Sequence, residues 1–483
     1  MSVAWSFLQR ATVALALAMA AVLPLLTIAF GTVTFADGSL FVLSILGPDP
    51  WTLVWASYPN RLSAFLLTIL PPFLVARTTG SAEAATAAYG LILGALPLVS
   101  LLLTMRLAGA RSVIAFGCAA STILAAFCVA FFPTELWLTH AAFWPLAALA
   151  LGPPGCTPLV LLGPALFTAF THEAALPPLG LLLAAAVVRR PSRGLIAVTA
   201  ITLGLPVLVK LVAPIPNADI ARTVGENAWN FLTADFLRSW MVDRGVVAGL
   251  AAGGVALILG RRNAGLAVAA AVLIALLAIL ALLLMPGELH VLRRYLTRTL
   301  VFVALVLAAS ALLAAELEAR FAPGLLIAAR TRISPLVVPL LTALAVTIGV
   351  TAAGHAVETA RFLGAWSALR TALSASAIDV AELPRGHLLV DRDERYWRGE
   401  GRDNDRRWVV AWNWGIPFQW AVMPGRTDSG AMPFMPSAPF APVRCSHMTA
   451  MEPRFLVAPE RIAILRARIC DIEANSLVDR LPH

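Results

Sequence analysis

Long apolar runs occupy the first three quarters of the chain and stop near residue 354. The runs are about 16 to 22 residues long and do not alternate with polar positions, as helices that cross a ~30 Å hydrocarbon layer require. They predict about eleven transmembrane helices in an all-α polytopic membrane protein. The first extends from Ala11 to about Gly31, and the others lie near residues 87–105, 112–132, 140–152, 156–171, 175–188, 194–213, 245–260, 264–285, 300–315 and 334–354.

The region between the first two runs has a different pattern. Residues 39–55 are apolar but interrupted by Gly47-Pro48-Asp49-Pro50, and residues 60–77 contain Pro71-Pro72 and have charges near both ends. Proline removes a backbone hydrogen bond from a helix interior, and the Trp and Tyr residues here suit a membrane–water boundary. We therefore expect interfacial helices within residues 38–77. The short runs 140–152 and 156–171 leave open a re-entrant hairpin.

The composition makes lipid the solvent for most of the chain. Apolar residues make up 59% and charged residues 13%, whereas an ordinary soluble domain is about half apolar and about a quarter charged. The net charge of +9 comes almost wholly from arginines that are spread over short loops. Nucleic-acid binding needs such charges on one surface, so we read them as topology signals and expect no nucleic-acid partner.

The arginines also predict the orientation. With a cytoplasmic N-terminus, ten arginines lie in the inner loops, and the bias is modest because the outer loops also hold arginines, whereas the outer loops hold most of the acids. The inner set is Arg106, Arg111, Arg189, Arg190, Arg193, Arg261, Arg262, Arg320, Arg330 and Arg332. An odd number of spans places the tail outside. Because the arginine- and alanine-rich composition indicates a bacterial gene, we expect the inner membrane, with 1–354 as the membrane module and 355–483 as a periplasmic domain.

The tail changes character sharply. Residues 391–407 are charged and rich in turn formers, and residues 408–420 contain four tryptophans. Short strands and loops, followed by a terminal helix near residues 459–470, predict a small α+β domain. Cys445 and Cys470 are the two cysteines of this tail, and they form a disulfide if the tail is periplasmic; the sequence leaves this pairing open.

Ionisable groups at a membrane boundary are functional candidates, because it is costly to hold them there. Asp37 follows the first run, and its carboxylate suits a general base, although Asp-Gly is also a common turn pair. Glu135 and His140 flank Trp137 between two runs, where a solvated loop with an interfacial Trp is the alternative.

Two further candidates lie in later loops. His172 and Glu173 sit between two long apolar stretches, and the alternative is a pair that closes a helix end. Before a late run, several basic and aromatic side chains suit a phosphate, because the guanidinium fork offers paired donors; arginines that snorkel to lipid head groups are the alternative. This group is Arg293, Arg294, Tyr295 and Arg298. No motif predicts a metal site or another cofactor.

The order of these features resembles the GT-C superfamily of glycosyltransferases, which use polyprenyl-phosphate sugars. Members have an acid just outside the first span, interfacial helices in a long first outer loop, an acid in the second outer loop and basic residues in later loops. The resemblance covers about residues 1–350. It implies catalytic roles for Asp37 and Glu135 and substrate- or donor-binding roles for the other candidates: His140, His172, Glu173, Arg293, Arg294, Tyr295 and Arg298. The second outer loop has no Asp-x-Asp motif, so any dependence on a divalent metal stays open.

The implied reaction is an inverting transfer of a sugar from a polyprenyl-phosphate donor to a periplasmic lipid, glycan or protein. Asp37 would take the proton of the acceptor hydroxyl, and Arg293 and Arg294 would hold the leaving phosphate. Three other functions remain as alternatives. A polysaccharide polymerase or ligase would use the outer loop 214–244, a transporter or flippase would need charges in mid-span, and a scaffold would bind its partner through the tail.

Overall fold

The computed structural model describes the chain in separate ranges, and all structural statements concern these residues. They are residues 2–35, 37–51, 55, 58–131, 134–152, 156–212, 244–259, 263–284, 291–321, 337–374, 416–422, 445–449 and 459–478. The described part is helical and contains no strand. This confirms the prediction of a helical protein with long apolar helices.

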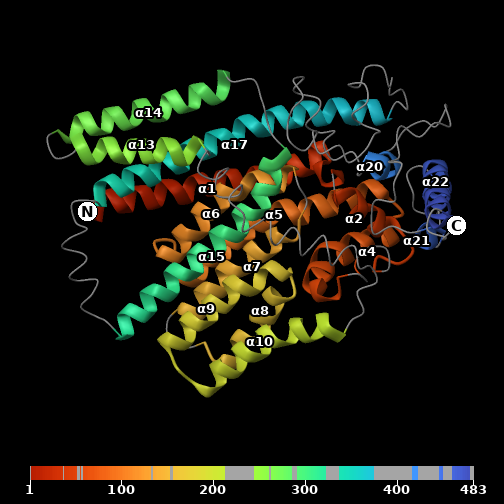
Figure 1. Ribbon diagram of the computed structural model, residues 1–483, viewed down its shortest axis with the longest axis horizontal. Helices are drawn as coiled ribbons and strands as arrows, with labels where there is room; N and C mark the ends of the chain where they lie inside the picture. The colour runs from red at the N-terminus through yellow and green to blue at the C-terminus, as the bar shows by residue number, and fades with distance from the viewer. Residues whose placement is uncertain are drawn as a thin grey trace.

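Each predicted span corresponds to a helix (Figure 1). The helices are α1 (Ser2–Phe30), α5 (Ala82–Ala108), α6 (Val113–Phe131), α7 (Leu136–Leu151), α8 (Pro158–Ala169), α9 (Leu176–Arg189), α10 (Arg193–Val212), α13 (Arg244–Leu259), α14 (Ala264–Leu284), α15 (Val291–Phe321) and α17 (Val337–Ser374). By length and composition, 6 helical segments of the described chain can cross a membrane, and several others are apolar but shorter. Residues 140–152 and 156–171 fall in separate helices, α7 and α8.

Capping residues set the ends of these helices. In α5 the N-cap Ser81 accepts a hydrogen bond from the Ala84 amide at 3.1 Å, and Glu83 lies in the first turn. A carboxylate there is favoured by the positive end of the helix dipole. The helix ends at Gly109, whose φ of 86° is a conformation that L side chains rarely adopt.

Helices α1 and α5 are antiparallel. Thr27, near the end of α1, donates to the Gly90 carbonyl at 2.8 Å, whereas Gln9, near its start, donates to the Ser112 carbonyl just beyond α5 at 2.8 Å. A Cβ at Gly94 would lie 2.5 Å from the Pro24 Cα. Glycine is therefore required for this close approach.

Contacts between the following helices continue the alternation. Ser121 of α6 meets His140 of α7, and Gly117 meets Trp144 one turn away, so these two helices are antiparallel. The start of α10 meets the start of α8 at Gly194 and Pro158. At its far end, α17 donates from the Trp366 indole to the Phe30 carbonyl at 2.8 Å.

These contacts define two ends of the bundle. We call the end where α1 finishes and α5 begins the distal end. The segment between α1 and α5 starts and finishes there, and it contains α2 (Asp37–Leu46) and the helical stretch Pro59–Thr79. Residues 134–135 and 170–175 lie at the same end, because the helices between them alternate in direction.

The stretch Pro59–Thr79 departs from the prediction. We expected a short interfacial helix within 60–77, but the stretch is long and apolar enough to cross a membrane. It consists of η3 (Pro59–Arg61), α3 (Leu62–Ala64), a π-helical turn η4 (Phe65–Ile69) and α4 (Leu70–Thr79). Since α1 and α5 are antiparallel, the segment between them starts and finishes at the distal end. If Pro59–Thr79 crossed the membrane once, a second crossing within this segment would have to bring the chain back. The 10 residues of α2 span only ~15 Å, too short to provide it.

The first described part of the tail, residues 355–374, continues α17. Beyond α17 the described parts of the tail are three helices at the distal end (Figure 1), namely α20 (Ile416–Val422), α21 (Cys445–Thr449) and α22 (Pro459–Val478). Helix α22 confirms the terminal helix predicted near residues 459–470 and extends beyond it. The Trp-rich segment, where we predicted strands, is helical at Ile416–Val422. The remaining segments on which the α+β prediction rests lie outside the described residues.

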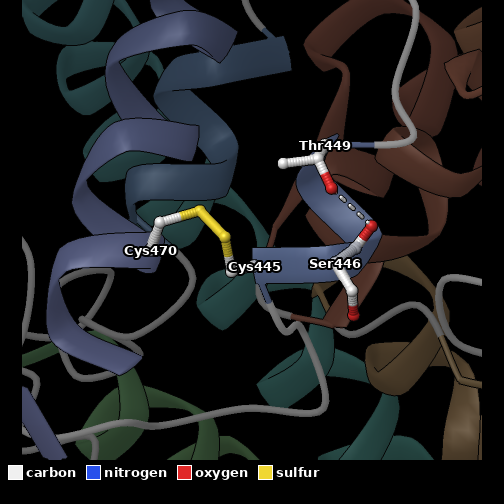
Figure 2. Close-up of a disulfide and its surroundings, with 4 residues drawn as sticks. All are labelled: Cys445, Ser446, Thr449 and Cys470. Carbon is white, nitrogen blue, oxygen red and sulfur yellow. Dashed lines mark hydrogen bonds between the residues drawn. A yellow bond between two sulfur atoms is a disulfide. The ribbon is translucent and has the colours of Figure 1, made fainter. Parts of the chain in front are cut away.

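A disulfide joins two of these tail helices (Figure 2). It connects Cys445 in α21 to Cys470 in α22. The buried Arg461 side chain of α22 donates to the Trp420 carbonyl at 3.0 Å and lies over the indole ring of the same residue. Because α20 packs in turn on α2, the described tail helices form one unit that is seated on the distal end.

Candidate functional site

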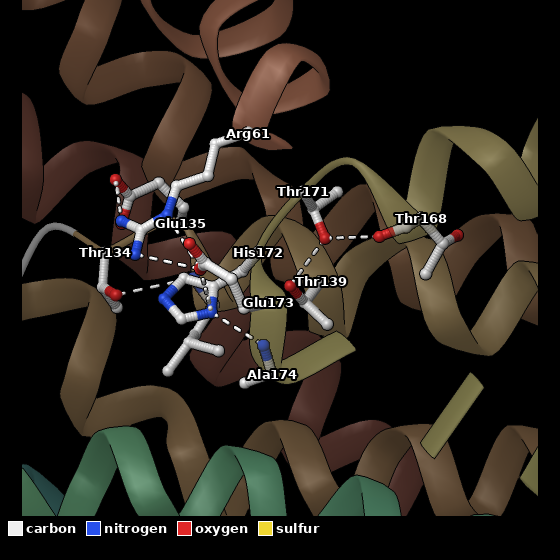
Figure 3. A network of polar contacts seen from close by, with 10 residues as sticks. Arg61, Thr134, Glu135, Thr139, Thr168, Thr171, His172, Glu173 and Ala174 are labelled. Carbon is white, nitrogen blue, oxygen red and sulfur yellow. Dashed lines mark hydrogen bonds and ion pairs between the residues drawn. The ribbon is translucent and has the colours of Figure 1, made fainter. Parts of the chain in front are cut away.

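Arg61 joins two carboxylates at the distal end (Figure 3). Its Nη1 lies 3.3 Å from Glu135 Oε1, and its Nε and Nη2 each lie 3.0 Å from Glu173 Oε2. The three side chains come from η3, from the residue before α7, and from η5 (Glu173–Ala175). We call these three residues the Arg61 cluster.

Local backbone contacts bring these segments together. The Ser63 amide donates to the Phe170 carbonyl at 3.0 Å, which ties the start of the 59–79 stretch to the loop after α8. Thr139 and Thr171 share a hydrogen bond of 2.7 Å between their hydroxyls, which ties α7 to the same loop. Since Thr171 donates to the Thr168 carbonyl, Thr139 is the donor to Thr171.

The electrostatics of the cluster are those of a largely desolvated ion pair. The side chains of Arg61, Glu135 and Glu173 are 12%, 5% and 22% exposed, respectively. Burial by itself raises the pKa of Glu173, but the positive charge of Arg61, together with His172 and hydrogen bonds from Asn60 and the backbone, outweighs burial and holds this pKa well below its usual range. Glu173 is therefore ionised, and it is a poor proton acceptor but a good hydrogen-bond acceptor.

His172 is fixed by the backbone beside it. It is the N-cap of η5, where its Nδ1 accepts a hydrogen bond from the Ala174 amide at 3.0 Å. The same nitrogen lies 3.4 Å from Glu173 Oε2. In the neutral ring the proton therefore sits on Nε2. The contacts agree with the helix-end reading of the His172–Glu173 pair, and they also place both side chains beside Arg61.

A pocket opens next to the cluster, between η3, the η5 turn, α9 and α10. It has a volume of about 150 Å³. Its polar lining consists of Asn60, Glu173 and Lys210, and its apolar lining consists of Ala169, Leu176, Pro206, Val207 and Leu211. Glu173 thus belongs both to the cluster and to the pocket.

The other predicted residues lie apart from this pocket. His140 is completely buried between α6 and α7, where its Nε2 lies 2.7 Å from the Ser121 hydroxyl. Asp37 is the first residue of α2 and therefore lies at the distal end, and its side chain is outside the described residues. The same limit applies to the side chains in the first turns of α15, which are those of Arg293, Arg294, Tyr295 and Arg298.

The backbone of α15 still places those four residues. Arg189, the last residue of α9, forms an ion pair with Glu316 at 2.8 Å, and Arg320 donates to the Val188 carbonyl at 2.6 Å. The two helices therefore finish at the same end and run parallel. The first turns of α15 consequently point toward the distal end, as α9 begins there.

Sequence reasoning missed three residues of the site, namely Arg61, Asn60 and the role of Lys210. Arg61 was noted only as part of a charged segment end. A basic residue directly before an apolar stretch, at the same bundle end as two isolated acids, was the available signal. Lys210 is the only lysine of the chain, and its position near a span end was visible.

The described residues contain no group of three or more His, Cys, Asp or Glu side chains that could hold a metal ion. No protein-family model matches the chain, and no curated protein or solved structure is significantly similar to it.

Proposed function

We propose that this protein is a membrane glycosyltransferase that moves a sugar from a polyprenyl-phosphate donor to a periplasmic acceptor. One observation carries the proposal. The loops that follow α1, α6 and α8, together with the start of α15, gather at one end of an alternating helix bundle. Two acids and an arginine from three of these segments are in contact there. Such clusters at a membrane boundary are costly and mark functional sites.

The side chains suit different roles in this reaction. Glu173 is ionised and held by Arg61, so it suits accepting hydrogen bonds from sugar hydroxyls. The side chain of Glu135 is only 5% exposed, and it suits holding Arg61 in place more than meeting a substrate. Asp37 begins α2 at the same end and remains our candidate for the base that takes the acceptor proton.

The disulfide supports the side of the membrane on which we place the site. Disulfides form and persist in oxidising compartments, and Cys445 and Cys470 are joined in helices that sit on the distal end. We infer that the distal end faces the periplasm. No nucleotide sugar is available there, so a lipid-linked donor is the source of the sugar.

The test is a transfer assay on purified protein reconstituted with a panel of polyprenyl-phosphate sugars. Release of free polyprenyl phosphate is measured for the wild type, Asp37→Asn and Arg294→Ala. Asp49→Asn is the matched control, since Asp49 is a second carboxylate of the same segment and only caps the Trp51 amide. We expect release by the wild type and the control only. If no donor releases polyprenyl phosphate, the glycosyltransferase proposal is refuted. If Asp37→Asn is fully active, the role of Asp37 as the base is refuted.

A further inference from the structure

The pocket beside the Arg61 cluster has one cation that nothing in the described structure compensates. Lys210 lines the pocket in the last turn of α10. Among the described residues it forms no ion pair and no hydrogen bond. The acid that shares the pocket, Glu173, already binds Arg61 through two nitrogens at 3.0 Å. The ammonium group of Lys210 is thus available for an anion.

The walls of the pocket indicate what kind of molecule bears that anion. The surface of the pocket is almost wholly apolar, and Leu176, Pro206, Val207 and Leu211 are among the residues that line it. The exposed side chain of Lys210 adds a charge beside this surface. Val207 and Leu211 are 47% and 78% exposed. Since α10 is long and apolar enough to cross a membrane, we place this face of α10 against the hydrocarbon of the bilayer. The pocket is therefore open to lipid, and a lipid can enter it sideways.

The size and shape of the pocket narrow the ligand further. Its volume of about 150 Å³ is below the ~300–1,000 Å³ of a pocket that encloses a whole drug-sized ligand. It therefore takes only the head of the lipid and the first carbons of its chain, while the rest of the chain stays in the bilayer.

We propose that this pocket binds the phosphate head group of the lipid-linked donor, with Lys210 as the phosphate ligand. Asn60 and Glu173 then meet the hydroxyls of the attached sugar, and the apolar wall meets the first carbons of the lipid chain. The carboxylate of Glu173 is tolerated near the phosphate because Arg61 neutralises it from the other side. This assignment rests on the proposed function and adds a phosphate ligand outside the arginines of α15.

Binding measured without turnover tests the assignment. Undecaprenyl phosphate is titrated into the purified full chain in detergent, and its affinity is followed by tryptophan fluorescence. We expect Lys210→Ala to weaken binding about tenfold or more, as the loss of one charge-assisted hydrogen bond implies. Lys210→Arg keeps the charge and should bind within about threefold of the wild type.

Two controls separate the donor from ordinary lipids. Arg106→Ala removes an exposed cation from the last turn of α5, at the opposite end of the bundle, and should leave binding unchanged. Phosphatidylglycerol in excess should not displace undecaprenyl phosphate. The assignment is overturned if Lys210→Ala binds as the wild type does, if Arg106→Ala loses as much affinity, or if phosphatidylglycerol competes equally well.

The outcome stays separate from that of the transfer assay. Lys210-dependent binding in a protein that transfers no sugar would refute the glycosyltransferase and leave the phosphate site standing. Sugar transfer by the wild type, together with unchanged binding by Lys210→Ala, would refute the phosphate site and leave the enzyme standing.

Discussion

Replacing Arg61 by methionine should destabilise the protein through two stranded carboxylates. Methionine keeps an apolar stem and removes the charge, so the change isolates the electrostatic part. Glu135 and Glu173 are 5% and 22% exposed and lie 3.3 and 3.0 Å from Arg61. Removing one partner of a buried ion pair costs about 3–5 kcal/mol. We expect a loss near 3 kcal/mol, because Glu173 retains some contact with water.

Arg61→Met should also change how the free energy of unfolding depends on pH. In the wild type the pKa of Glu173 is depressed below its value in the unfolded chain, which is about 4.3 for glutamate. The stability that it contributes is therefore present above pH ~4.3 and is lost as the pH falls further. Without Arg61, burial raises the pKa of Glu173. The variant should then gain stability as the pH falls from 7 toward ~4.3, where the wild type is flat with respect to this group.

The free energy of unfolding is measured by titration with a denaturing detergent, followed by tryptophan fluorescence at pH 7 and pH 5. The triple variant Arg61→Met, Glu135→Gln, Glu173→Gln is the matched control, since it has no stranded charge, and it should recover much of the loss. The reasoning is wrong if Arg61→Met stays within about 0.5 kcal/mol of the wild type, the range of ordinary surface changes. It is equally wrong if the triple variant is no more stable than the single one.

Three further predictions concern packing, the tail and orientation. Gly94→Ala should lower the free energy of unfolding, followed by thermal unfolding, by about 1–3 kcal/mol, because its Cβ would lie 2.5 Å from the Pro24 Cα. The control Gly163→Ala in α8 meets nothing within 4 Å and should be neutral or mildly stabilising, so equal losses in the two variants would contradict this. Cys445→Ser should make the α21–α22 unit more sensitive to limited proteolysis, as loss of a disulfide costs about 2–4 kcal/mol, and Cys156→Ser, which alters a cysteine without a disulfide, should not. Single cysteines placed at Gly109 and Ser81, which flank the two ends of α5, should be labelled by impermeant maleimide from opposite sides of the membrane, and labelling of both from one side would refute a crossing of the membrane by α5.

The sequence predicted the helices well because apolar length is a local property. Each run of about 16 to 22 apolar residues can satisfy its backbone in lipid only as a helix, and every described run did so. Parity also held. Counting spans places Asp37, Glu135 and Glu173 at one end, and the contacts between α1, α5, α6 and α7 agree. The helical stretch Pro59–Thr79 is longer than the short helix that we predicted, because the two prolines sit in the first turn of α4, where a missing amide costs little.

The pairing of the site was beyond sequence reasoning, because it depends on contacts between distant positions. Arg61 lies 74 residues before Glu135 and 112 residues before Glu173 in the sequence. No spacing rule relates residues so far apart. Each acid alone is equally consistent with a solvated loop. Only the packing of η3 against the loop after α8 shows that one arginine serves both acids. The pocket with Lys210 depends on the same packing, as its walls come from α9, α10 and the η5 turn.

The distribution of ionisable groups favours an enzyme that works at one face over a transporter. A transporter holds its substrate near the bilayer midplane, with access from both sides in turn. In the described residues the linked acids and Arg61 lie at the distal end, and Lys210 lies in the last turn of α10 beside them. The buried His140 pairs with a neutral serine, and it needs no ion to compensate it. A lipid that enters from the side and reacts at one surface fits this arrangement, because neither step requires a charged path through the bundle.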